Sequence, residues 1–259
     1  MHMRRLYVIA LALLFAFQLG SVSAYYNITA INTTVLLNSS TGARVIETYS
    51  IFISNSSIAQ YEASRGAYNL SISDWRSILN SQLLTEHILN PRSGASNVTF
   101  LPGALILTPQ GAASEIILSY YVYNVTNVQE IAPRKFLYAF NDSVLNFEHT
   151  ASGQELGPSE RFNIIVPEGS QIVSIYPLPD LPAVSVAGSY SNDTLFSWNS
   201  QEPLNSFTMS YIILQTPQEE VLSYFDALYN NNRQLIYLLG IILLGVFVAY
   251  VYLKFVVPE

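Results

Sequence analysis

The chain has 259 residues, of which 50% are hydrophobic, 11% are charged and none is a cysteine. An average soluble domain carries roughly 25% charged residues, and a disordered chain needs more charge and less apolar content than this one has. The net charge of −7 argues against nucleic-acid binding, and the lack of cysteine excludes disulfides, thiolate metal sites and a cysteine nucleophile.

The N-terminus has the pattern of a secretory signal peptide. Arg4 and Arg5 are followed by an apolar run, and Val22 and Ala24 supply small residues before a cut that would leave Tyr25 as the first residue. Residues 1–24 are therefore predicted to be a signal peptide. The alternative is an uncleaved signal anchor, because the stretch from Leu6 to Ala24 contains no charge.

The following segment alternates apolar and polar residues with a period of two, which is typical of β-strands. Glu47, Tyr49, Ile51 and Ile53 are expected on one face of a strand, whereas the stretch 116–125 is apolar on both faces and is expected to lie centrally. The fold class predicted is mainly β, an antiparallel β-sandwich. The remaining predicted strands are 26–37, 98–101, 104–108, 136–140, 144–148, 162–166, 171–176, 184–188, 194–199 and 207–213.

The number of sandwich units is left open between one and two. The stretch 127–134 is the least apolar connection and ends in Ala-Pro-Arg. A two-unit division would therefore place a first β-rich unit at 25–130 and a second sandwich unit at 131–216.

One helix is predicted inside the first unit, over 73–89. Trp75, Leu79 and Leu83 have helical spacing, Ser73 is the expected N-cap, and Asn90-Pro91 is the expected stop. His87 would then lie near the C-terminal end of this helix, where the dipole favours an imidazolium.

A second helix is predicted over the juxtamembrane segment, 217–233. Thr216 and Glu219 fit a capping box and Pro217 fits the first helical position. The apolar stripe that follows allows two placements: docked under the sandwich, or lying in the membrane interface.

Residues 234–254 are predicted to form a transmembrane helix. Leu235 to Leu253 contains no charge, and at 1.5 Å per residue it spans about 28 Å, close to the roughly 30 Å hydrocarbon core of a bilayer. With the signal peptide, this gives a single-pass type I protein with an extracytoplasmic ectodomain and a short cytoplasmic tail, 255–259.

Asn-x-Ser/Thr sequons are frequent in the predicted ectodomain. Glycosylation of several of them is expected, although a chain rich in Ser, Thr and Asn also produces such triplets by chance. The nine candidates are Asn27, Asn32, Asn38, Asn55, Asn69, Asn97, Asn124, Asn141 and Asn192.

Groups for catalysis or metal binding are scarce. Glu148 and His149, with Glu155 and Glu160 downstream, could offer a carboxylate-assisted base or a weak metal site. Neighbouring strand residues point to opposite faces, however, so surface positions are favoured. No assembled catalytic motif is found, and we expect neither enzymatic activity nor a cofactor.

Tyrosine is abundant, with 18 residues in the chain. Tyr120, Tyr121, Tyr123 and Tyr138 are close in sequence and could form a binding face for carbohydrate or protein. The alternative, which composition favours, is that these rings fill the core.

These patterns favour a non-enzymatic, membrane-anchored envelope glycoprotein that binds a neighbouring envelope protein or a surface glycan. The alternative is an accessory subunit of a larger membrane complex for transport, secretion or glycan transfer. Helix association through Gly240 and Gly245 would favour that alternative, although their spacing misses the small-xxx-small pattern by one residue.

Overall fold

The computed structural model describes residues 25–67, 70–151, 153–182 and 193–218, together with 220–222, 229, 237 and 240–247. The protein is mainly β, with strands that pair almost entirely in antiparallel fashion. The predicted signal peptide 1–24, the predicted strand 184–188 and the predicted tail 255–259 lie outside the described residues.

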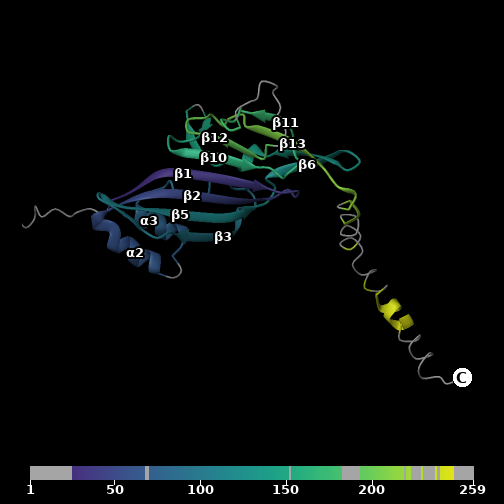
Figure 1. Cartoon of the computed structure of the whole chain (residues 1–259), viewed down its shortest axis with the longest axis horizontal. Helices are drawn as coiled ribbons and strands as arrows, with labels where there is room; N and C mark the ends of the chain where they lie inside the picture. The colour runs from purple at the N-terminus through teal and green to yellow at the C-terminus, as the bar shows by residue number, and fades with distance from the viewer. Residues whose placement is uncertain are drawn as a thin grey trace, which may run out of the picture.

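The larger sheet has seven strands in the order β12-β10-β1-β2-β5-β3, with β4 also paired to β5 (Figure 1). All of its pairs are antiparallel except the parallel pair of β1 and β10. Its strands are β1 (Tyr26–Leu37), β2 (Ala43–Ser54), β3 (Ala95–Pro102), β4 (Ile106–Thr108), β5 (Gly111–Val122), β10 (Glu160–Ile165) and β12 (Leu195–Trp198).

A four-stranded sheet has the order β11-β13-β7-β6, and a separate two-stranded hairpin is formed by β8 and β9. The strands of these two sheets are β6 (Thr126–Ala132), β7 (Lys135–Phe140), β8 (Glu148–Thr150), β9 (Gly153–Glu155), β11 (Gln171–Tyr176) and β13 (Thr208–Leu214).

Aromatic side chains join the two larger sheets into one core. Phe207, just before β13, contacts Phe162 of β10 and Trp198 of β12, with ring centroids 5.6 and 5.1 Å apart. It also contacts Phe140 of β7 at 5.3 Å. Burying several aromatic rings in mutual contact is worth a few kcal/mol beyond area alone, since each such pair contributes about 0.5–1.5 kcal/mol.

The predicted division at 130/131 does not separate two sheets. Residues 126–132 and 135–140 form the β6–β7 hairpin, so the stretch interpreted as a linker is a strand and a tight turn. β10 and β12, which follow this turn, pair with β1 in the seven-stranded sheet. The low apolar content of this stretch reflects exposure and not a linker, since β6 is exposed over most of its length.

The predicted helix 73–89 is shorter and begins earlier than expected. Helix α3 (Ile72–Leu79) starts at the N-cap Ser71, which forms a capping box with Asp74. It ends because Asn80 adopts a left-handed conformation, with φ of 47°, and its N–H bonds back to the carbonyls of Arg76 and Ser77. The segment that follows, including His87, is not helical.

Three short helices interrupt the strands in addition to α3. The α-helix α2 (Ile58–Gly66) was not expected from the sequence, and its Tyr61 is buried against α3 through Trp75, with ring centroids 5.5 Å apart. The 3-10 helices are η1 (Asn55–Ser57) and η2 (Asp142–Val144). The predicted strand 144–148 does not form as a single strand: η2 covers its first residue, Leu145 forms only an isolated bridge with Ile88, and β8 begins at Glu148. The Asn141 side chain, just before η2, accepts a bond from the Ser143 N–H.

Beyond β13, the described residues of the juxtamembrane segment are helical. Glu220 forms an ion pair with Arg134 in the β6–β7 turn, at 3.6 Å, whereas the neighbouring Val221 and Leu222 are exposed. Of the predicted transmembrane helix 234–254, the described stretch 240–247 is helical and lies away from the sheets in Figure 1. No helix among the described residues has the length and hydropathy needed to cross a bilayer.

Candidate functional site

The outward side of the seven-stranded sheet carries a group of solvent-accessible side chains. On β2 and β5 the inward residues are buried, and the alternation leaves the intervening residues exposed or half-buried. We call this surface the open face and define it by Arg44, Thr48 and Ser50 of β2 with Ile117, Ser119 and Tyr121 of β5.

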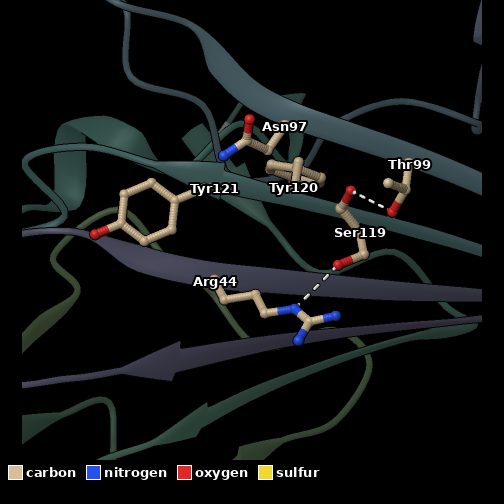
Figure 2. Close-up of a pocket in the computed structure, with 6 residues that line it drawn as sticks. All are labelled: Arg44, Asn97, Thr99, Ser119, Tyr120 and Tyr121. Carbon is tan, nitrogen blue, oxygen red and sulfur yellow. Dashed lines mark hydrogen bonds between the residues drawn. The ribbon is translucent and has the colours of Figure 1, made fainter.

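Two depressions, each of about 290 Å³, lie on this face. The second is bounded by Thr29, Ser50, Ile106 and Glu115, among others. The first, drawn in Figure 2 and called here the Arg44 depression, is lined by Arg44, Asn97, Thr99, Ser119, Tyr120 and Tyr121.

Strand register builds the Arg44 depression. Arg44 of β2 pairs directly with Tyr121 of β5, and Thr99 of β3 pairs with Ser119 of β5. Directly opposed residues on one face of an antiparallel pair bring their side chains together. Arg44 Nε donates to Ser119 Oγ at 3.2 Å, and Thr99 Oγ1 donates to the Ser119 carbonyl at 3.1 Å (Figure 2).

A bulge in β3 supplies the upper wall seen in Figure 2. The register of β3 against β5 shifts between Ser96 and Thr99, and Asn97 there has φ of 51°. Asparagine tolerates this left-handed conformation better than most residues, and bulges commonly redirect a side chain. The exposed Asn97 amide therefore faces the depression beside Tyr121.

The Tyr121 ring is held in place by its surroundings. Gly42 leaves room for the Tyr121 hydroxyl, because a Cβ atom at residue 42 would lie 2.2 Å from its oxygen. Tyr121 also packs on Tyr123 in an edge-to-face arrangement, with ring centroids 4.9 Å apart. The tyrosine therefore presents a fixed, half-buried ring.

The Arg44 guanidinium is exposed, and no described carboxylate lies within 4.0 Å of it. The remaining lining side chains are hydroxyls, an amide and aromatic rings, and none of them is an acid or base suited to proton transfer at neutral pH. The depression is thus equipped for binding through hydrogen bonds and one positive charge.

The four tyrosines expected as a possible binding face lie in different environments. Tyr120 and Tyr138 are buried, with 1% and 4% of their surface exposed. Tyr121 is half-buried and Tyr123 is 50% exposed, so only this pair contacts solvent on the outward side. Alternation along β5 explains the separation of Tyr120 from Tyr121.

Most of the sequons lie on the surface. Asn69 and Asn192 are outside the described residues, and Asn141 is half-buried. The exposed asparagines are Asn27, Asn32, Asn38, Asn55, Asn97 and Asn124.

These placements give an expected glycosylation pattern. We expect glycans on the six exposed asparagines but an unmodified Asn141, whose Nδ2 donates to the Asn124 carbonyl at 3.3 Å and whose Oδ1 accepts from Ser143. Mass spectrometry of glycopeptides from the protein made in its native host measures occupancy at each site. Occupancy at Asn141 equal to that at Asn124 would contradict the expectation.

A second group of functional side chains is buried in the core, and we call it the Glu47 cluster: Glu47 and Tyr49 of β2, His87, Tyr120 of β5 and Glu160 of β10. The two Glu47 oxygens are surrounded by donors. Oε1 accepts from the His87 N–H at 2.7 Å and from the Tyr120 hydroxyl, and Oε2 contacts His87 Nδ1 at 3.0 Å and the Tyr49 hydroxyl.

The other side of the His87 ring faces Glu160. His87 Nε2 lies 3.7 Å from Glu160 Oε1, and Glu160 Oε2 accepts from the Gly157 N–H at 2.9 Å. Burial alone would lower the pKa of His87, but the charges and hydrogen bonds of Glu47 and Glu160 raise this pKa to about 9. Burial would raise the pKa of Glu160, and its bonds to His87 and Gly157 lower it instead.

The cluster ties three strands to the segment after α3. Tyr120 also accepts from the Ile88 N–H at 3.1 Å, and the Tyr49 hydroxyl contacts the Thr85 carbonyl. The cluster therefore fixes residues 85–88 against the sheet, and Tyr120 is the member that also lines the Arg44 depression. Sequence reasoning placed His87 on a helix and missed this arrangement. The usable signal was Glu47 itself, a carboxylate at an inward strand position that requires a partner.

The carboxylates expected near His149 do not gather around it. Glu148 and Glu155 are opposed in the β8–β9 hairpin, His149 is exposed, and Glu160 belongs to the Glu47 cluster. No group of three or more potential metal ligands occurs among the described residues.

No protein-family model matches the chain, and no curated protein is significantly similar to it in sequence.

Proposed function

We propose that the chain is a non-enzymatic, single-pass type I membrane glycoprotein of the cell envelope, with a β-sandwich ectodomain that binds a neighbouring envelope protein or a surface glycan. The open face supports the binding proposal. It has two depressions, and aromatic, hydroxyl, amide and guanidinium groups line them. Small-molecule and glycan sites typically combine an apolar surface with a few fixed polar groups.

The anchoring part of the proposal draws support from the C-terminal apolar segment. Ile241, Leu243, Leu244 and Phe247 are each more than 60% exposed within the described helical stretch 240–247. Large apolar side chains that the described residues leave exposed are stabilised by transfer into lipid, at roughly 25 cal/mol per Å² of apolar surface. A bilayer is the environment that supplies this stabilisation.

The binding part is tested by placing a charge in the middle of the open face. Ile117, which is 36% exposed, pairs with Thr48 and Leu101 between the two depressions. We expect Ile117→Arg in the full-length chain, reconstituted in lipid nanodiscs, to weaken binding to envelope fragments from the native host at least about tenfold, because a central interface contact is worth more than 1 kcal/mol. Quantitative co-sedimentation measures this binding.

A matched control is Val173→Arg on β11, which is 57% exposed on the other sheet. Val173→Arg should bind as the wild type does. Equal loss in both variants, or binding by Ile117→Arg that equals the wild type, would disprove a role for the open face. Treating the fragments with protease or with periodate distinguishes a protein partner from a glycan.

A further inference from the structure

We propose that the Arg44 depression is a binding site for a saccharide that carries a carboxylate group, such as a uronic acid. This inference depends on the proposed function and names the class of ligand for the open face. Three features of the depression carry it: a fixed aromatic ring, an arginine without a described carboxylate partner, and side chains that both donate and accept hydrogen bonds.

The aromatic ring suits the apolar face of a sugar. Tyr121 packs against Gly42 and Tyr123, and Figure 2 shows its ring face-on, with Asn97 and Arg44 beside its edge. C–H groups that gather on one face of a pyranose form an apolar patch, and such a patch packs on an aromatic ring. A tyrosine that is already fixed loses little conformational entropy when the sugar binds.

Arg44 selects for negative charge. Its Nε is used in the bond to Ser119, and no described carboxylate lies within 4.0 Å of the guanidinium. The planar guanidinium matches the two oxygens of a carboxylate, and such charge-assisted bonds are roughly twice as strong as neutral ones. A neutral sugar would leave this charge without a counterpart.

The neighbouring polar groups match sugar hydroxyls, which donate and accept at the same time. The Asn97 amide offers both functions, and the hydroxyls of Thr99 and Ser119 retain acceptor capacity beside their existing bonds. The volume of about 290 Å³ is at the lower end of the range for small-molecule sites, roughly 300–1,000 Å³. The depression therefore fits a short saccharide segment.

This saccharide could come from two sources with the same chemistry. Asn97 lies in the wall of the depression and begins the sequon Asn97-Val98-Thr99, so a glycan attached there could fold back onto Tyr121. Such a tether gives a high effective concentration. The other source is a glycan on a separate molecule.

The experiment uses the full-length chain in nanodiscs, as wild type and as Asn97→Gln, with a short oligogalacturonate and its carboxyl-reduced counterpart as probes. We expect calorimetry to detect binding of oligogalacturonate and at least about tenfold weaker binding of the reduced probe. Arg44→Gln should weaken binding of oligogalacturonate by a similar factor. Tyr121→Phe should retain binding and Tyr121→Ser should lose it.

The matched control is Arg161→Gln. Arg161 is exposed on β10 of the same sheet, and its Nε bonds to Asn199 Oδ1 at 2.9 Å, much as Arg44 bonds to Ser119. This variant should bind as the parent does. A general attraction between a polyanion and surface arginines would instead weaken both variants equally, and that result would overturn the inference.

The wild-type chain and the Asn97→Gln variant distinguish the two possible sources of the saccharide. Binding by the wild type supports a separate glycan, whereas binding only after Asn97→Gln supports the chain's own glycan as the occupant. Absence of binding in both backgrounds overturns the inference. If envelope binding then remains sensitive to Ile117→Arg, the proposed function stands and only the carboxylated saccharide is rejected.

Discussion

Replacing Glu47 with Gln is expected to lower the free energy of unfolding by about 3–5 kcal/mol at pH near 6, the usual cost of breaking a buried ion pair. The Glu47 carboxylate has 0% exposure, and each of its oxygens faces two groups from His87, Tyr49 and Tyr120. A glutamine would turn an NH₂ group toward two of these donors and leave His87 without its closest negative charge. Denaturant unfolding of the full-length chain in detergent, followed by the fluorescence of the buried Trp75 and Trp198, measures the change.

The control is Glu62→Gln. Glu62 pairs with Arg65 at 2.7 Å on the surface of α2, and exposed pairs of this kind contribute about 0–1 kcal/mol. If Glu47→Gln abolishes folding, Tyr120→Phe serves as a milder variant, because it removes one donor to Glu47 and the acceptor of the Ile88 N–H. Loss of less than about 0.5 kcal/mol in Tyr120→Phe would show that the cluster does not stabilise the fold.

The stability of the protein is expected to be greatest between about pH 4.5 and 6.5. The pKa of His87 rises on folding from 6.5 to about 9, so its contribution is complete below pH 6.5 and is lost as the pH rises through 9. The pKa of Glu160 is lowered from 4.5, so its contribution is complete above pH 4.5 and is lost as the pH falls through the folded value. As the pH rises through 9, the loss of the His87 contribution lowers the free energy of unfolding by about 3 kcal/mol.

Unfolding curves collected across this pH range, together with NMR titration of the histidine ring protons, test the expectation. His149→Gln removes an exposed histidine and should leave the alkaline slope unchanged, whereas His87→Gln should remove it. A wild-type stability that stays constant between pH 6.5 and 9 would contradict the arrangement of charges in the cluster.

Local patterns predicted the strands well. The interval 26–37 is β1 as observed, and the inward set of Glu47, Tyr49, Ile51 and Ile53 is buried as its alternation indicates. These strands expose one face and bury the other, so apolar and polar residues alternate along the sequence and reveal the strand. The predicted strands 162–166 and 207–213 likewise correspond to β10 and β13.

Features that depend on distant contacts were not predictable in this way. The parallel pairing of β1 with β10 and the meeting of Glu47, His87 and Glu160 join segments that are far apart in the chain. The helix was predicted to reach residue 89 because the apolar spacing continues that far. It ends at Leu79 because Asn80 adopts the left-handed conformation. Of the residues that line the Arg44 depression, Tyr121 was predicted as part of a possible binding face and Asn97 only as a glycosylation candidate. Arg44 and Ser119 join them through the register of β2, β3 and β5.

The parallel pairing of β1 with β10 also affects the order in which the strands can pair during folding. Ile31 of β1 pairs with Glu160 of β10, so β1 is synthesised long before its partner strand. Until β10 is available, one edge of β1 has unpaired backbone groups. An open edge can recruit a strand from another molecule, and pairing across a long stretch of chain is slow. The order of synthesis therefore favours late closure of the seven-stranded sheet, after β10 has been made.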